Sequence, residues 1–248
     1  KEGKLSITVN SNTEFTSPFV MPRFQTRYGT GSDGIYSSTS ARSWGAHLTE
    51  ANYYGYNPAD DYFQMGIIGT ESVSLSTGTE KNQTYASAAA VNSKGIIPNN
   101  KYNRYNFTVR NTTSFLNDKM KLDVSASYIL QNDQNMTNQG TYNNPLVGAY
   151  LYPRGNDWED ITMYERYDPA RKIYTQYWPI GDEAMAMQNP YWINYRNLRN
   201  NKKDRYMLSA GLSYQILDWL SVSGRVRLDN SNNDYTEKFY ASTNTQLT

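Results

Sequence analysis

Long runs in which apolar and polar residues strictly alternate restrict the fold of this sequence more than any other feature. In the clearest run, 205–216, every second residue is apolar or aromatic: Tyr206, Leu208, Ala210, Leu212, Tyr214 and Ile216. Residues 220–229 and 121–131 repeat the pattern. Because alternate side chains of a β-strand point to opposite faces, these runs predict strands with one apolar and one polar face.

The same reading predicts an all-β chain of about seven antiparallel strands. They are expected over 5–9, 65–78, 84–92, 104–116, 121–131, 205–216 and 220–229. The run 84–92 contains so much Ala that its faces cannot be assigned. Most strands have about 10 to 13 residues, whereas a soluble strand has about 5 or 6 and a bilayer-spanning strand about 9 to 11. Strand length therefore favours a membrane barrel.

The connections alternate between short and long. Short turns are expected at 79–83, 117–119 and 217–219, with long loops at about 17–62 and 133–204 and a modest one at 94–101. Short turns at one end and long loops at the other are typical of outer-membrane barrels, whose long loops are extracellular. All nine Pro residues lie in the longer connections, as expected because Pro cannot donate a hydrogen bond to a strand ladder.

A soluble β-sandwich would also alternate, so it must be weighed against the barrel. Its strands would be shorter, and a loop as long as 133–204 without clear elements is uncommon in a compact soluble domain. The transmembrane β-barrel is therefore the preferred interpretation. A secreted, soluble β-sheet protein that binds glycans is the alternative.

Composition excludes several other classes of protein. The net charge of +1 gives no footprint for nucleic acid. The absence of Cys and the single His exclude disulfides, thiolate metal sites and multi-histidine metal centres. No apolar run approaches the length of a transmembrane helix. Leu, Ile, Val and Phe total 43 of 248 residues, which predicts that no ordinary thick core exists.

No set of residues suits catalysis, so the chain is not expected to be an enzyme and no cofactor or metal is assigned. Gly29–Gly34 matches GxGxxG, but no helix is expected after it to bind a pyrophosphate, so the glycines are interpreted as turn residues. The acids Asp60–Asp61 and Asp157–Asp160 are interpreted as solvated loop residues, with calcium a minor alternative. His47 lacks partners for a triad.

Aromatic residues are the candidate binding groups. Residues 133–204 contain 12 of them beside Asn, Arg and Asp, and amphipathic rings of this kind suit contact with sugars and peptides. The residues expected to bind substrate or a partner are Trp44, Trp158, Tyr164, Tyr167, Trp178, Tyr191 and Trp192. The alternative for each ring is that it packs the loop on itself or against a partner protein.

An ordered series of short motifs resembles the SusC/RagA family of TonB-dependent outer-membrane transporters of Bacteroidetes. The motifs are Pro22–Gln25 followed by Tyr28–Gly34, Ser43–Gly45, Asp61–Gly66, Ser72–Gly78, Lys94–Asn99 leading to Arg104, and Asn189–Tyr191. Each motif is weak alone, but their order is specific, and they extend from near the N-terminus to about residue 190.

The resemblance implies a plugged barrel of about 22 strands, of which residues 1–248 would be the N-terminal part. It implies import of oligosaccharides or peptides across the outer membrane of a Gram-negative bacterium. The implied partners are a SusD-like surface lipoprotein, which acts as a lid, and TonB-ExbB-ExbD. Because plug, TonB box and signal peptide are missing and seven strands cannot close a barrel, the chain is expected to be a segment of a longer polypeptide.

If the strands span a membrane, their two faces meet different surroundings. The apolar positions are expected to face lipid: Leu208, Leu212, Ile216, Leu220, Val222, Val226 and Leu228. Arg225 and Arg227 are expected to face the lumen, and the loops at 17–62 and 133–204 are expected to form an extracellular vestibule.

Overall fold

The computed structural model describes residues 3–53, 55–182 and 185–244. Its long strands are β1 (Ser6–Thr16), β4 (Gly66–Gly78), β5 (Asn82–Lys94), β6 (Lys101–Phe115), β7 (Met120–Gln134), β10 (Asn197–Leu217) and β11 (Leu220–Phe239). The shorter elements are β2 (Gly31–Ser32), β3 (Ile35–Tyr36), α1 (Pro58–Asp61), α2 (Pro145–Leu151), α3 (Glu159–Thr162), β8 (Glu165–Asp168), β9 (Ile173–Gln176) and α4 (Pro190–Arg196).

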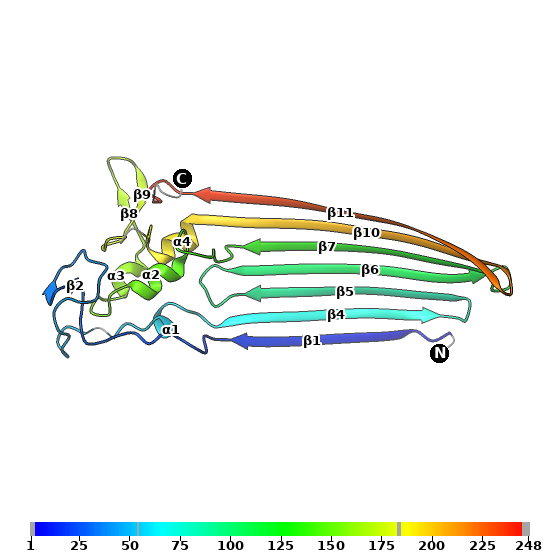
Figure 1. The fold of residues 1–248 in the computed structure, drawn as a ribbon, viewed down its shortest axis with the longest axis horizontal. Helices are drawn as coiled ribbons and strands as arrows, with labels where there is room; N and C mark the ends of the chain where they lie inside the picture. The colour runs from blue at the N-terminus through cyan, green and yellow to red at the C-terminus, as the bar shows by residue number, and fades with distance from the viewer. Residues whose placement is uncertain (1–2, 54, 183–184, 245–248) are drawn as a thin grey trace.

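The long strands form one antiparallel sheet of seven strands in the order β1-β4-β5-β6-β7-β10-β11 (Figure 1). This confirms the expected all-β class and the seven strands. The sheet is open, with β1 and β11 at its edges. Closure into a barrel of about 22 strands therefore stays a prediction.

Three strands extend more than five residues beyond their expected bounds. β1 continues to Thr16 rather than ending at 9. β10 begins at Asn197, eight residues before the predicted start at 205, and β11 continues to Phe239 rather than ending at 229. The additional segments of β10 and β11 pair with each other, from Asn197 opposite Phe239 to Asp204 opposite Asn232. Most of their residues are polar on both faces, so the alternation that predicted the rest of β10 and β11 is absent from these segments. The loop expected over 133–204 is accordingly shorter.

Continuous register gives the sheet two distinct faces. One row of directly paired residues consists of Ile7, Leu75, Ala86, Val109, Ala126, Leu208 and Leu228. The next row, on the opposite face, consists of Thr8, Ser74, Ser87, Thr108, Ser127, Met207 and Asp229. We refer to these as the apolar face and the polar face. The predicted separation of Val226 from Arg225 and Arg227 holds, because neighbouring residues of a strand lie on opposite faces.

Nothing in the described part of the chain covers the apolar face. Val9 is 72% exposed and Val226 is 75% exposed. The polar face lines a hollow of about 1000 Å³. In this hollow Arg110 pairs with Asp123 at 2.7 Å, and Asp229, which also lines it, pairs with Arg205. The sheet thus has no hydrophobic core on either side.

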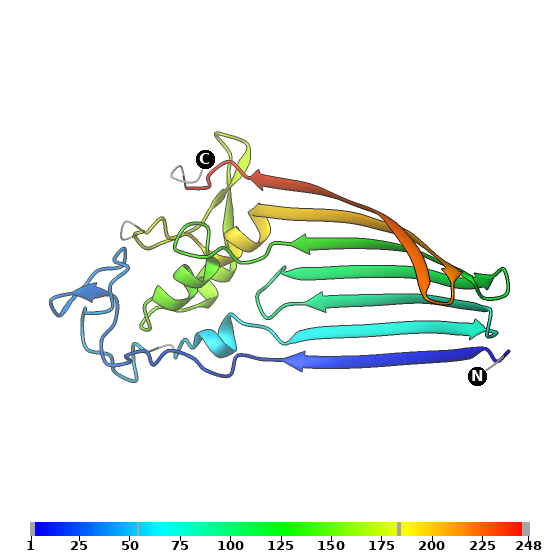
Figure 2. The same cartoon turned by 45° about the vertical axis from the view of Figure 1, so that its right-hand side comes forward.

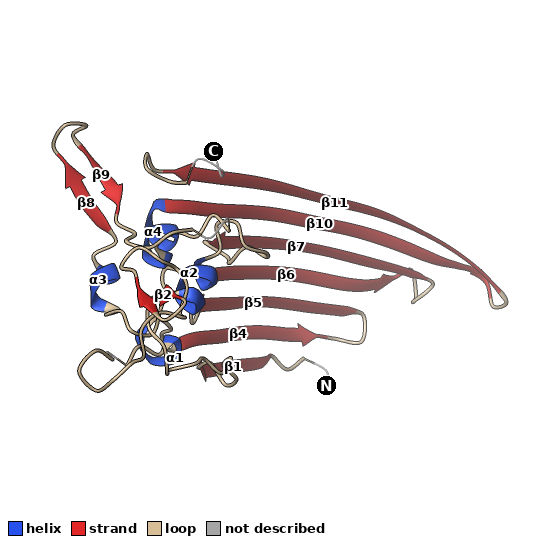
Figure 3. Cartoon of the chain, turned by 60° about the vertical axis from the view of Figure 1, so that its left-hand side comes forward, coloured by secondary structure: helices blue, strands red, loops and turns tan. Residues whose placement is uncertain are grey.

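The long connections gather at one end of the sheet, where they form a cap (Figures 1 and 2). We define the cap as residues 17–65, between β1 and β4, together with residues 135–196, between β7 and β10. Its helices and the β8–β9 hairpin stand beyond the strand ends (Figure 3). Within the described residues, no helix is long and apolar enough to cross a membrane.

Three of the cap helices begin in the same way. α1, α2 and α4 each start with Pro after an Asn N-cap, at Asn57, Asn144 and Asn189. Each Asn side chain accepts a hydrogen bond from a backbone N–H of the first turn. Pro suits the first helical position because its fixed φ is helical and its missing N–H would have no partner there. The Asn-Pro pairs are therefore the sequence signal for helices inside loops.

Candidate functional site

The hydrophobic core of the described residues lies in the cap, not in the sheet. Its buried members come from both long connections: Ala41, Tyr56, Tyr62, Ala149, Tyr152, Trp158, Ile161, Ile180 and Met187. The cap is therefore a folded unit built from two segments about 100 residues apart in sequence. As the part of the molecule with both a core and surface hollows, it is the candidate functional site.

Aromatic rings make the centre of this core. Tyr56 from the first connection stacks on Trp158 from the second, with ring centroids 4.2 Å apart and an interplanar angle of 3°. Tyr152 and Tyr62 each meet Trp158 edge-on, at 5.4 and 6.0 Å. Stacked and edge-to-face pairs are the favoured geometries of aromatic quadrupoles. The two connections are thus locked together by ring packing.

Burial changes the chemistry of the tyrosines in this cluster. The hydroxyl of Tyr56 donates to the backbone oxygen of Ala149 at 2.5 Å, and the hydroxyl of Tyr62 accepts from Nδ2 of Asn194 at 2.8 Å. Desolvation raises the pKa of both Tyr56 and Tyr62 well above the ordinary value. Both rings therefore stay neutral under physiological conditions and act as packing and hydrogen-bonding groups.

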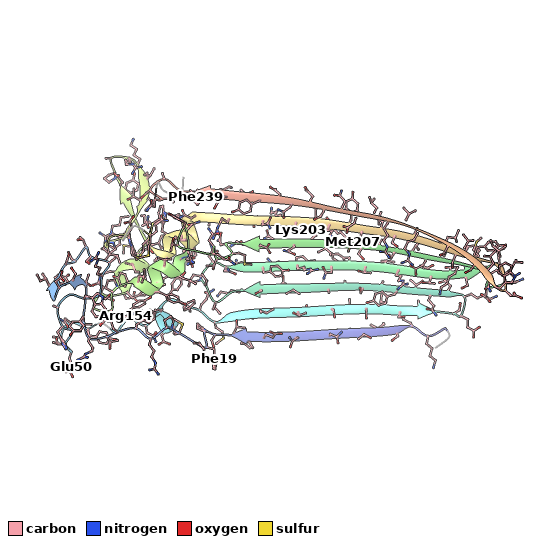
Figure 4. The ribbon with its side chains drawn as sticks, viewed as in Figure 1. Phe19, Glu50, Arg154, Lys203, Met207 and Phe239 are labelled. Carbon is pink, nitrogen blue, oxygen red and sulfur yellow. The ribbon has the colours of Figure 1, made fainter. Side chains whose placement is uncertain are left out.

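Arg154 is a buried cation that joins the two connections. Its guanidinium lies 3.9 Å from the ring centroid of Phe24 and 4.5 Å from that of Tyr56, and the residue is 3% exposed. It donates to the backbone oxygens of Tyr56 and Tyr150, each at 3.4 Å. Burial lowers the pKa of Arg154, yet a guanidinium stays charged in proteins. Ring faces and carbonyl oxygens compensate the charge, and Figure 4 shows Arg154 within the cap.

Asn189 organises the second connection from a fully buried position. Its Nδ2 donates to the backbone oxygens of Ile161 at 2.8 Å and Tyr177 at 3.0 Å. Its Oδ1 accepts from the backbone N–H of Tyr191 at 2.9 Å and of Trp192 at 3.4 Å, at the start of α4. One side chain thus fixes α3, the segment after β9 and α4 relative to one another.

A polar chain continues from α4 toward the end of β11. Trp192 Nε1 donates to Thr243 Oγ1 at 3.1 Å, and Thr243 Oγ1 donates to Asn197 Oδ1 at 2.6 Å. Asn197 Nδ2 then donates to Asn143 Oδ1 at 2.9 Å. These groups are buried, so each bond replaces hydration lost on folding. This series of hydrogen bonds anchors the cap to the ends of β10 and β11.

The β8–β9 hairpin projects from the cap, and an ion pair holds its base. Arg196 binds both carboxylate oxygens of Glu165, at 2.6 and 2.7 Å. The hydrogen bond to Glu165 raises the pKa of Arg196. Tyr164 stacks on Tyr195 at 5.6 Å, which holds the base of the hairpin further.

Two hollows open on the cap surface. One, of about 480 Å³, lies between the connections and is lined by tyrosines and polar groups that include Tyr36, Tyr152, Asn156, Asp160 and Tyr177. The other, of about 510 Å³, is lined by Phe24, Arg42, Trp44, Tyr150 and Arg154. Concave surfaces that combine rings with a few polar groups are the usual setting for ligands.

The expected binding residues fall into two groups. Trp44 and Tyr167 are exposed, at 60% and 54%, and Trp44 lines the second hollow. Trp158 and Trp192 are buried, at 5% and 0%, while Trp178 and Tyr191 are partly buried against the core. Tyr164 is partly buried beside Arg196. Binding by this set stays a prediction, and burial limits Trp158 and Trp192 to shaping the surface.

Sequence reasoning missed several residues of the hollows. Tyr36, Tyr150 and Tyr177 line them, as do Phe24 and Arg154. Phe24 belongs to the Pro22–Gln25 motif, but that motif gave no sign of a binding role. Tyr36 and Arg154 had no local pattern to single them out, because these residues meet their neighbours only when the two connections pack together. Tyr150 and Tyr177 belong to the twelve aromatic residues of 133–204, but no local pattern distinguishes them from the other rings there.

The remaining motifs serve local structure. Gly31 and Gly34 have positive φ, 126° and 77°, around the β2–β3 turn, as expected of turn glycines. The carboxylate of Asp61 accepts from the backbone N–H of Asn57, and that of Asp157 accepts from the N–H of Glu159. Across the described residues, no group of three or more Asp, Glu, His or Cys is arranged to hold a metal ion. His47 packs edge-on against Tyr28 at 5.6 Å.

Comparisons with known proteins show a likeness of fold. No protein-family model matches the sequence, and no curated protein matches it. The fold is similar to a solved structure described as "Structure of the RagAB peptide importer in the 'closed-closed' state", with a TM-score of 0.57 and 15% sequence identity. The likeness covers 99% of this chain and 30% of that one. The seven-stranded sheet with its cap therefore has the fold of part of that solved chain.

Proposed function

We propose that this chain forms part of the wall and the extracellular cap of a β-barrel in the outer membrane of a Gram-negative bacterium. The complete barrel imports large nutrients, either oligosaccharides or peptides, by TonB-dependent transport. The likeness to part of a peptide importer supports a role in nutrient import. The family resemblance of the ordered motifs, from Pro22 to Tyr191, points the same way.

The uncovered apolar face carries this proposal. From the row that contains Val9 and Tyr206 to the strand ends away from the cap, the apolar face presents no Asp, Glu, Lys or Arg on any of the seven strands. Aromatic side chains lie near both limits of this zone: Tyr105, Phe107, Tyr128 and Tyr206 toward the cap, and Phe115, Tyr214 and Trp219 at the far end. A charge-free band between aromatic girdles is characteristic of the outer surface of a membrane barrel, which supports the proposal.

The polar face and the cap support the part of the proposal that concerns transport. The ion pairs of the polar face suit a hydrated or protein-filled lumen. The cap, with its two hollows, acts as the vestibule for cargo and as the surface on which a SusD-like lipoprotein closes. TonB-ExbB-ExbD supplies energy through regions outside this chain.

The decisive test is the electrophoretic behaviour of the full-length native polypeptide extracted from its source membrane. A closed barrel resists detergent until it is boiled, so the unboiled protein should migrate differently from the boiled one. The mass of the full-length polypeptide should exceed that of this chain several-fold, because this chain spans 30% of the matched importer chain. A species of about 28.4 kDa that folds without detergent would contradict the proposal.

The alternative is a secreted, soluble β-sheet protein that binds glycans. The ring-lined hollows of the cap suit contact with sugars, which favours this alternative. It requires, however, that something other than lipid cover Val9, Val226 and their neighbours, which are exposed. The same gel separates the two proposals.

A further inference from the structure

Two lysines on the apolar face directly oppose each other beside the cap. Lys94, the last residue of β5, pairs with Lys101, the first residue of β6. Both are exposed, and within the described chain neither side chain has a hydrogen bond or an acid at ion-pair distance. Like charges directly opposite one another destabilise a sheet. The pair therefore presents two unneutralised cations that an anion would stabilise.

A groove runs along the same two strands, farther from the cap. Its floor is the small side chains of Ala88 and Ala90 on β5, and its walls are Val73 on β4 with Tyr105 and Phe107 on β6. Its volume is about 340 Å³. Ala90 lies four residues from Lys94, or roughly 13 Å along the strand at the usual rise. An extended apolar chain fits the groove while its polar end reaches the lysines.

We propose that Lys94, Lys101 and the alanine groove bind one phosphorylated membrane lipid. The phosphate lies between the two ammonium groups and an acyl chain lies over Ala88 and Ala90. This inference rests on the proposed membrane location, in which the lysines stand on the cap side of Tyr105 and Phe107. Aromatic residues of that kind mark the interface, so the lysines reach headgroup level.

The chemistry favours a lipid over a free anion. Lysine binds phosphate as a point charge, which would serve either ligand, but the adjoining groove offers apolar contact that inorganic phosphate cannot use. Glu71, which borders the groove beside Ala90, lies four residues from the lysine row. At roughly 13 Å it lies beyond a Debye length and does not neutralise the pair.

The test compares lipid retention by full-length variants purified in detergent, measured by native mass spectrometry. The probes are dioleoyl phosphatidylglycerol, the zwitterionic dioleoyl phosphatidylcholine and inorganic phosphate. The variants are K94Q/K101Q, which removes the pair, and A88L/A90L, which fills the groove and keeps the lysines. The control K202Q/K238Q removes the same charge from the same face on β10 and β11, away from the groove.

The native protein should retain phosphatidylglycerol over phosphatidylcholine. K94Q/K101Q should weaken that retention roughly tenfold, A88L/A90L should also weaken it, and the control should match the native protein. Equal retention by all four proteins would overturn the inference. If equimolar inorganic phosphate displaced the lipid, the lipid proposal would be wrong and the lysines would form a site for free phosphate.

The outcome also separates this inference from the proposed function. A heat-shifting barrel with unchanged retention in K94Q/K101Q would overturn the lipid site alone. Absence of a heat-shifting species would overturn the membrane location and the lipid site together.

Discussion

The cap buries its apolar side chains, whereas the sheet leaves those of one face exposed. In the cap, Trp158 and Ile161 are 5% and 0% exposed, whereas Val9 and Val226 of the sheet are 72% and 75% exposed. The cap has its own core and can exclude water by itself. The sheet presents an apolar face that needs an external apolar phase, as expected if lipid takes the place of a core. Each region should therefore respond to different perturbations.

The largest expected effect is on the cap. Asn189→Ala removes four hydrogen bonds, and the backbone groups of Ile161, Tyr177, Tyr191 and Trp192 lose this buried or partly buried partner. The free energy of unfolding of the cap should fall by about 3–5 kcal/mol. Pulse proteolysis of the cap should report the loss, while the heat-resistant mobility of the barrel persists.

Asn144→Ala is the matched control for that substitution. Asn144 caps α2 in the same way but is partly exposed and makes a single capping bond to Leu146. Its loss should cost about 1 kcal/mol. Equal effects of the two substitutions would contradict the central position of Asn189.

The sheet should respond most to a charge on its apolar face. Val226→Arg should destabilise the intact barrel by about 2–4 kcal/mol if Val226 lies near the middle of the bilayer. Arg227→Val, one residue away on the polar face, should do much less. Urea titration of the barrel in lipid vesicles measures both, and equal tolerance would contradict the assignment of the faces.

Alkaline pH should loosen the cap. Burial raises the pKa of Tyr56 and Tyr62 in the folded state, so the unfolded state releases its tyrosine protons first. The stability from these groups is complete below about pH 10, the ordinary tyrosine pKa. It should fall by about 1 kcal/mol per tyrosine at pH 11. Protease sensitivity of the cap between pH 9 and 11 checks this, and Tyr62→Phe should reduce the pH dependence.

A smaller effect is expected at the β8–β9 hairpin. Glu165→Gln weakens the pair with Arg196, whose side chains are 19% and 26% exposed. The partial exposure limits the loss to about 1 kcal/mol. Cleavage within 165–176 should increase, whereas Glu159→Gln, an exposed acid on α3, should leave it unchanged.

The smallest effect on stability is expected at Trp44. Because Trp44 is 60% exposed, Trp44→Ala should change the free energy of unfolding by no more than about 0.5 kcal/mol. Its position in the second hollow predicts weaker binding of cargo or of the lid lipoprotein. Titration with an oligosaccharide and a peptide library measures this, and unchanged affinity for cargo and lid would remove Trp44 from the site.

The sheet was predictable from sequence because its signal is local. Alternation was clearest over 121–131, 205–216 and 220–229, and was less regular or absent in the other expected strands. It missed 10–16, 197–204 and 230–239, where most residues on both faces are polar. The cap was less predictable. Its long loops followed from turn residues and Pro, but the stacking of Tyr56 on Trp158 and the position of Arg154 depend on contacts between segments about 100 residues apart. The Asn-Pro pairs were the one local signal there that could have been used.

The adjacency of strand ends beside the cap bears on how such a protein can acquire new specificity. Thr16 pairs with Gly66, so the whole of residues 17–65 joins two neighbouring strand ends that are already adjacent. A segment of any length can join such a pair, and doubling its length adds only about 0.6 kcal/mol of closure entropy. The strands therefore form a constant framework for the cap segments. A cap segment can be exchanged for another without redesigning the strands that carry it.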